Sequence, residues 1–185
     1  MFSASMVEVA CRGALAHKDS RIIVACVVTG LLKPISEEFN VNYINALAIA
    51  KSRGIEVVSS TSDESGRYKN LIGVVLKANG GTVSVMGTLM PDKGPRIVDI
   101  DGNSVDIEPE GNFLLIGHSD KPGMIGKVGT VLGDNDVNIA SMEVARKTVR
   151  GPAMMILTLD DELPPAVLAK VREITDLKSA ISIKL

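Results

Sequence analysis

Apolar and polar positions in the first part of the chain predict a strand, then helices. Residues 6–10 alternate as in a half-buried strand. Asp19-Ser20 can begin a helix that runs to Leu32, and a second short helix is expected over 45–52. The apolar face of the first helix is expected to consist of Ile22, Ile23, Cys26, Val27 and Leu31.

Five further runs in this region have the composition of strands, with turn residues between them. They cover residues 55–60, 71–77, 82–89, 97–100 and 104–107. Asp101-Gly102 separates the last two runs and predicts a hairpin. We therefore expect an N-terminal α+β domain with an antiparallel strand meander.

A polar break at Glu108-Pro109-Glu110-Gly111 places the domain boundary, giving domains 1–109 and 110–185. After it the pattern restarts as strand, helix, strand, strand, helix, strand. The expected ranges are 112–117, 122–132, 138–146, 153–159, 164–175 and 180–185. This order predicts a ferredoxin-like βαββαβ domain, with both helices on one face of a four-stranded sheet.

Composition narrows the class of protein. The net charge is −2, aromatic residues make up 3% and Trp is absent, so neither a basic stripe nor stacking platforms for nucleic acid are expected. The apolar runs are too short to span a membrane, and the N-terminus does not read as a secretory signal. Cys11 and Cys26 are expected to be reduced core thiols rather than metal ligands. A cytoplasmic protein is the expectation.

Polar groups gather where the strand over 112–117 meets the next helix. His118 supplies an imidazole and Asp120 a carboxylate, while the helix expected to begin at Pro122 offers unpaired N–H groups. Gly123 lets backbone approach a ligand, and Asn138 can donate and accept hydrogen bonds. These residues predict a site for a small polar ligand. The alternatives are a capping or turn role for Asp120, an exposed or satisfied His118 without a ligand, and Asn138 as a turn cap.

The run from Gly117 to Gly129, with 137–142, resembles an ACT domain, most closely those that end D-3-phosphoglycerate dehydrogenases. Residues 7–13, 30–34, 41–46 and 50–55 resemble the intervening, allosteric substrate-binding domain of the same enzymes. The resemblance implies a non-catalytic regulatory region. No G-x-G-x-x-G loop follows a strand, so NAD would belong to the catalytic domains of the parent oxidoreductase, and no cofactor is expected in this chain.

The resemblance also implies a ligand and partners. ACT domains of such enzymes pair side by side and hold L-serine in the seam, which carries over to His118, Asp120 and Asn138, with Gly123 beside them. L-serine or another small amino acid, a second copy of the chain and dehydrogenase catalytic domains are thus the expected partners. Asp120 would receive the ammonium, and the helix N–H groups the carboxylate.

In the first domain the resemblance implies an anionic effector. The candidate cations are Arg12, Lys69 and Arg96. The negative charge of Glu108, at a position where a basic residue would be expected in some relatives, disfavours an anion site here. The alternative is that these are solvated surface charges. Two further functions stay open for the whole chain: a structural oligomerisation module without a ligand, and a subunit of iron–sulfur L-serine dehydratase, although no cluster cysteines are found.

Overall fold

The computed structural model describes residues 4–35 and 40–185. By internal contacts the chain divides into two compact units, which we describe separately. The first holds the chain up to Gly102 together with Asp106–Glu108, and the second holds Asn103–Val105 together with Pro109–Leu185. Such a division does not test independent folding, so the domain boundary at 109/110 stays a prediction. Within the described ranges no helix is long and apolar enough to cross a membrane.

The N-terminal unit is built on a six-stranded sheet with the order β2-β1-β3-β4-β5-β6. The strands are β1 (Ala4–Gly13), β2 (Glu56–Ser62), β3 (Asn70–Ala78), β4 (Gly81–Met90), β5 (Gly94–Ile100) and β6 (Asn103–Ile107). The predicted antiparallel meander is present from β3 to β5. Asp101 and Gly102 both have positive φ, 52° and 72°, and form the predicted hairpin turn. The parallel pairing of β1 with β2 was not predicted.

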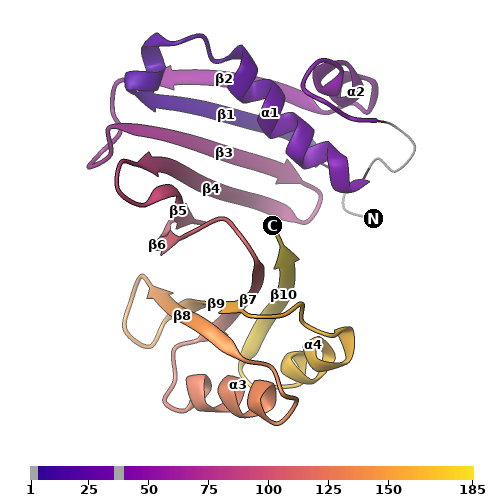
Figure 1. Cartoon of the computed structure of the whole chain (residues 1–185), viewed down its shortest axis with the longest axis vertical. Helices are drawn as coiled ribbons and strands as arrows, with labels where there is room; N and C mark the ends of the chain where they lie inside the picture. The colour runs from indigo at the N-terminus through magenta and orange to yellow at the C-terminus, as the bar shows by residue number, and fades with distance from the viewer. Residues whose placement is uncertain (1–3, 36–39) are drawn as a thin grey trace. The chain divides into compact units, whose positions relative to one another are not determined.

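Two helices pack on one face of this sheet (Figure 1): α1 (Arg21–Leu32) and α2 (Ala46–Ser52). Short 3₁₀ turns, η1 (Ala14–His17) and η2 (Lys33–Ile35), flank α1. The predicted apolar face of α1 is confirmed for Ile23, Val27 and Leu31, which pack half-buried against the core, but not for Ile22 and Cys26. Its buried side chains are Val24, Ala25, Val28 and Leu32, whereas Ile22 is 55% exposed. Apolar residues surround most of α1, so contact with Val7 and Val9 of β1 decides the buried stripe, and periodicity cannot.

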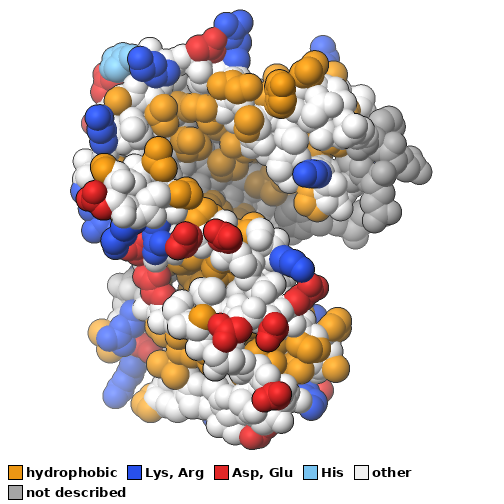
Figure 2. Space-filling view, viewed as in Figure 1, with side chains coloured by type: hydrophobic (Ala, Val, Ile, Leu, Met, Phe, Trp, Pro, Cys, Tyr) orange, Lys and Arg blue, Asp and Glu red, His pale blue; other side chains and the backbone are white. Residues whose placement is uncertain are grey.

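Helices leave part of that sheet face open. Val85 of β4 pairs with Val74, which packs against the core on the helix-covered face. Val83 and Leu89 lie on the same face of β4 as Val85, because alternate residues of a strand share a face. Val83 and Leu89 are nevertheless exposed, Leu89 at 67%. Figure 2 shows apolar side chains gathered on the visible surface of the N-terminal unit. The core of this unit therefore lies mainly under the two helices, beside β1 and β3.

The C-terminal unit has the predicted βαββαβ order. Its elements are β7 (Asn112–Ser119), α3 (Met124–Gly133), β8 (Ile139–Arg146), β9 (Pro152–Leu159), α4 (Pro165–Arg172) and β10 (Leu177–Lys184). The sheet order is β10-β7-β9-β8, with all neighbours antiparallel. Both helices cover one face (Figure 1), where Leu114, Ile116, Val128 and Val171 share one core. This is the expected ferredoxin-like arrangement.

The start of α3 differs from the prediction. The helix begins at Met124, its N-cap is Gly123 with φ of 87°, and Pro122 lies outside it. A left-handed residue is needed here because the chain bends sharply between β7 and α3, and glycine adopts that conformation without steric cost. Pro122 thus lies in the loop before the helix rather than opening it.

Candidate functional site

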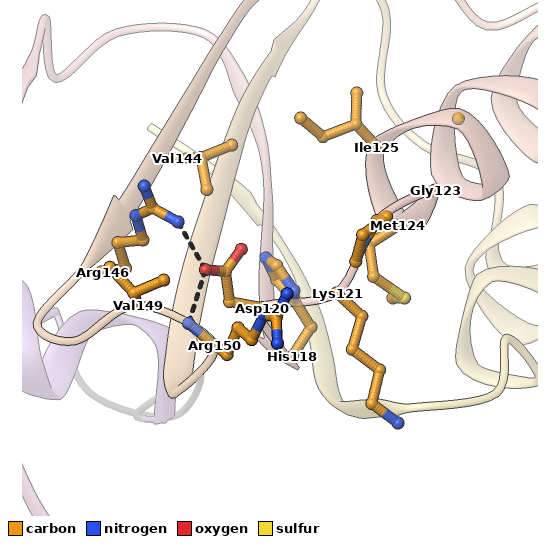
Figure 3. Close-up of a pocket in the computed structure, with 12 residues that line it drawn as sticks. His118, Asp120, Lys121, Gly123, Met124, Ile125, Val144, Arg146, Val149 and Arg150 are labelled. Atoms are coloured by element: carbon orange, nitrogen blue, oxygen red, sulfur yellow. Dashed lines mark hydrogen bonds and ion pairs between the residues drawn. The ribbon is translucent and has the colours of Figure 1, made fainter.

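A cavity of about 370 Å³ lies in the C-terminal unit, where the end of β7, the start of α3 and the β8–β9 hairpin meet (Figure 3). Its lining includes His118, Asp120, Lys121, Gly123, Val144, Arg146, Val149 and Arg150. Three of the four predicted ligand contacts, His118, Asp120 and Gly123, therefore line one cavity.

His118 follows Leu114 and Ile116 on the helix-facing side of β7 and is only 2% exposed. Among the described residues it is the one buried side chain that is polar or charged. Its Nδ1 lies 2.9 Å from the carbonyl oxygen of Ser119. A carbonyl only accepts, so Nδ1–H donates and Nε2 carries the lone pair of the neutral ring.

Nε2 of His118 is buried without a hydrogen-bond partner. Leaving such an acceptor unpaired costs about 1–3 kcal/mol, so native proteins rarely keep one without a reason. His118 also lines the cavity, but Nε2 itself is buried, so a ligand that donates a hydrogen bond can satisfy this nitrogen only after neighbouring side chains move. His118 is therefore not an exposed residue, and within the described chain its Nδ1 is paired while its Nε2 is not.

Asp120 is held by the hairpin between β8 and β9. Its Oδ2 accepts from the Arg146 guanidinium at 2.6 Å and from the backbone N–H of Arg150 at 3.0 Å (Figure 3). Its own backbone N–H donates to the carbonyl of Gly151 at 2.9 Å. The Arg146 bond, and then the Arg150 bond, keep the pKa of Asp120 below its usual value. Asp120 is therefore an ionised anchor for the hairpin and does not cap α3.

The hairpin tip is strained where it meets Asp120. Arg150 has φ of 60°, a left-handed conformation that costs a residue with a Cβ about 1–2 kcal/mol. The bond from its N–H to Asp120 helps to hold that conformation. Val149, the residue just before Arg150, is 75% exposed and also lines the cavity.

Sequence reasoning missed Arg146 and Arg150. One signal could have found Arg146: Met142, Val144 and Arg146 alternate along β8 and therefore share one face of the strand. Met142 packs on the helix-side core, so Arg146 belongs to the same side of the sheet as His118. Nothing in the local sequence places the backbone of Arg150 beside Asp120.

Asn138 lies apart from the cavity within one chain. It precedes β8, whose Ile139 pairs with Leu159 while Arg146 pairs with Ala153 at the other end. At about 3.3 Å per residue these ends are roughly 23 Å apart. The Asn138 side chain is exposed, and its Nδ2 donates to Oδ2 of Asp160 at 2.5 Å. One copy of the chain does not bring Asn138 to His118.

The three candidate cations of the N-terminal unit differ in surroundings. Arg12 ends β1 beside β3, where Ala14 N–H donates to the carbonyl of Lys69 at 3.1 Å. Arg96 is paired already: its guanidinium lies 2.7 Å from Asp106 and 3.5 Å from Glu108. An anion at Arg96 would compete with two carboxylates, and the anion site stays a prediction.

The two cysteines are both unpaired thiols but differ in exposure. Cys11 is fully buried, and burial raises its pKa, whereas Cys26 is exposed on α1. The prediction of a core thiol is thus wrong for Cys26, because α1 turns a different face to the sheet. Across the described ranges, no cluster of three or more His, Cys, Asp or Glu side chains could hold a metal ion.

The fold defines a two-domain α+β protein whose second half is an ACT-type domain with a cavity after its first strand, lined by both charged and apolar side chains. A family model for the D-3-phosphoglycerate dehydrogenase intervening domain matches residues 3–101, and the ACT domain model matches residues 113–176. The chain belongs to the family of D-3-phosphoglycerate dehydrogenase intervening domains, followed here by an ACT domain.

Curated relatives share this arrangement over almost the whole chain. D-3-phosphoglycerate dehydrogenase of Bacillus subtilis is 37% identical over 97% of the chain, and that of Methanocaldococcus jannaschii 38% over 99%. The chain spans only about a third of their length, 33% and 34%. A solved ACT domain from GTP pyrophosphokinase of Chlorobium tepidum is 20% identical, with a TM-score of 0.33, and covers 40% of this chain and 85% of its own.

Proposed function

We propose that this chain is the non-catalytic regulatory region of a cytoplasmic D-3-phosphoglycerate dehydrogenase and binds L-serine for feedback control of serine biosynthesis. Relatives of that name are about three times as long and match the chain end to end. The NAD-dependent catalytic domains would lie in the part of such an enzyme that this chain does not match. Another small amino acid in place of serine would suit the same site.

The observation that carries the proposal is the buried, unpartnered Nε2 of His118 beside an ionised Asp120 in one cavity. The ammonium and hydroxyl groups of serine are donors, and the two residues offer acceptors. A charge-assisted bond from the ammonium to Asp120 is stronger than a neutral one. The hydroxyl can then reach the imidazole nitrogen once side chains beside the buried Nε2 move aside. A site that binds a hydroxyl in this way rejects analogues that lack it.

A homodimer through the ACT domains completes the proposal. β8 is an edge of the four-stranded sheet, and an unpaired edge favours association with another strand. Two-fold symmetry sets two β8 edges antiparallel, so the Asn138 end of one strand meets the Arg146 end of the other. Asn138 of the partner subunit could therefore join His118 and Asp120, although one chain keeps them apart.

Isothermal titration calorimetry of the full chain with L-serine tests this function. We expect saturable heat, and at least tenfold weaker binding by Asp120→Asn, which loses the anion. Asp106→Asn is the matched control, because Asp106 also pairs with an arginine, Arg96, but in the N-terminal unit. Its serine affinity should equal that of the wild type.

The same titration separates the competing function. A dimer in analytical ultracentrifugation that gives no heat with millimolar L-serine, glycine or alanine would support a structural oligomerisation module and reject amino-acid sensing. Binding that survives Asp120→Asn unchanged would reject the site while leaving sensing in place.

A further inference from the structure

We propose that Arg146 receives the carboxylate of the bound amino acid and so determines specificity for ligands with a free α-carboxylate. This inference rests on the proposed function and assigns a role that the sequence pattern gave to the N–H groups of α3. Those groups carry only partial charge, and α3 starts at Met124, after Gly123, rather than at Pro122. The guanidinium brings a full charge to the same cavity.

The sheet register places Arg146 opposite His118. Both residues pair with Ala153 of the strand between them, β9, at strand spacings that put their Cα atoms about 10 Å apart. Side chains directly paired across antiparallel strands share a face, so all three lie on the helix-facing side. Ala153 contributes only a methyl group between the two larger side chains.

The donors of Arg146 are only partly used. One nitrogen of the guanidinium binds Oδ2 of Asp120 at 2.6 Å, and the side chain is 50% exposed. A guanidinium has five N–H donors in a planar fork that matches a carboxylate. Donors beyond the one on Asp120 can therefore bind a ligand carboxylate without breaking that ion pair.

The Asp120–Arg146 pair also matches a zwitterion in charge order. An α-amino acid carries its ammonium and its carboxylate on the same carbon. When the amino acid binds beside this ion pair, its ammonium can contact Asp120 while its carboxylate contacts Arg146. In Figure 3 the second carboxylate oxygen of Asp120 points away from the Arg146 and Arg150 contacts, so it can receive the ammonium.

Two other cations line the cavity but are placed differently. The Lys121 ammonium lies 2.7 Å from Asp176 and extends away from Asp120 (Figure 3). Arg150 reaches Asp120 through its backbone N–H, and its exposed position at the hairpin tip does not fix its side chain in the cavity. Arg146 is the cation whose position the sheet and Asp120 determine together.

The test compares L-serine with L-serinamide, which replaces the carboxylate by a neutral amide. Titrations of the full chain at about pH 6, below the usual pKa of an α-amino group, keep both ligands protonated. Wild-type protein should bind L-serine at least tenfold more tightly than the amide. In Arg146→Met that preference should fall to about twofold or less, through weaker serine binding alone. Arg146→Lys keeps the charge without the fork and should show an intermediate preference.

Lys121→Met is the matched control, since it removes a cation of the cavity rim that pairs elsewhere, and it should keep the wild-type preference. An unchanged preference in Arg146→Met would overturn the inference while leaving serine binding intact. If that variant fails to fold, a wild-type preference in Arg146→Lys overturns it instead. A wild-type protein that binds neither ligand would overturn the proposed function and this inference together.

Discussion

His118 and Arg146 pair with the same residue, Ala153, from opposite sides of β9. Two side chains from distant parts of the sequence thereby lie on one face of the sheet, at the end where Asp120 follows β7. The charged lining of the cavity at this place therefore depends on strand register. A slip of one residue in β8 would turn Arg146 to the other face and remove it from the cavity.

We predict that His118→Leu separates binding from stability. The substitution removes a buried, unpaired nitrogen and one hydrogen bond to Ser119, while nearly keeping the side-chain volume. The free energy of unfolding should change by less than about 1 kcal/mol, because an apolar replacement avoids the cost of the unpaired acceptor. L-serine affinity should fall at least tenfold. Urea unfolding and calorimetry measure the two, and unchanged affinity would contradict the role of Nε2.

Gly123→Ala should destabilise the protein by about 1–2 kcal/mol through backbone strain alone. The φ of 87° is left-handed, but an added Cβ would meet no atom within 4 Å, so no clash contributes. Gly129→Ala is the control within α3, where a Cβ also meets nothing within 4 Å. It should stabilise by about 1 kcal/mol through helix propensity. Equal effects of the two variants in urea unfolding would show that Gly123 is not strained.

Acid should weaken the fold through Asp106 and Asp120. Hydrogen bonds from Arg96 and then Lys93 lower the pKa of Asp106, and those from Arg146 and then Arg150 lower that of Asp120. A lowered folded-state pKa adds stability that is complete above the unfolded value of about 3.9 and is lost as pH falls through the folded value. The Asp106→Asn, Asp120→Asn double variant should lose less stability than wild type between about pH 5 and 2. Parallel urea-unfolding curves for the two proteins would refute this.

The two thiols should react at different rates. An aromatic disulfide reagent should modify Cys26 rapidly in the native protein and Cys11 only after unfolding, because Cys11 is fully buried with a raised pKa. Cys26→Ser should abolish the fast phase, whereas Cys11→Ser should keep it. A fast phase that persists in Cys26→Ser would place Cys11 at the surface.

Most elements could be predicted because strand alternation and turn residues are local signals. The runs at 71–77 and 82–89 lie within β3 and β4, and Asp101-Gly102 forms its hairpin turn. The face of α1 could be predicted only in part, since its apolar residues surround the helix and tertiary contact with β1 selects among them. The predicted start of α3 at Pro122 is wrong. Proline suits the first turn of a helix, but Gly123 is left-handed and forms the N-cap, so the helix begins only at Met124.

The site was partly predictable for the same physical reason. His118, Asp120 and Gly123 lie within a few residues of one strand–helix junction, so their proximity is local. Arg146 and the Arg150 backbone reach Asp120 through strand pairing, which composition and spacing do not encode. Asn138 is the opposite case. The family resemblance implies that it shares a site with His118, but within one chain the length of β8 separates the two residues.

The length of β8 has a consequence for how such a sensor would respond. Under the proposed seam, each ligand would be enclosed by the Arg146 end of one strand and the Asn138 end of its counterpart. Ligand binding and dimerisation would then be thermodynamically linked. Dilution of the protein would favour monomers and thereby lower its apparent affinity for the amino acid. Feedback of this kind would depend on how abundant the enzyme is as well as on the concentration of its end product.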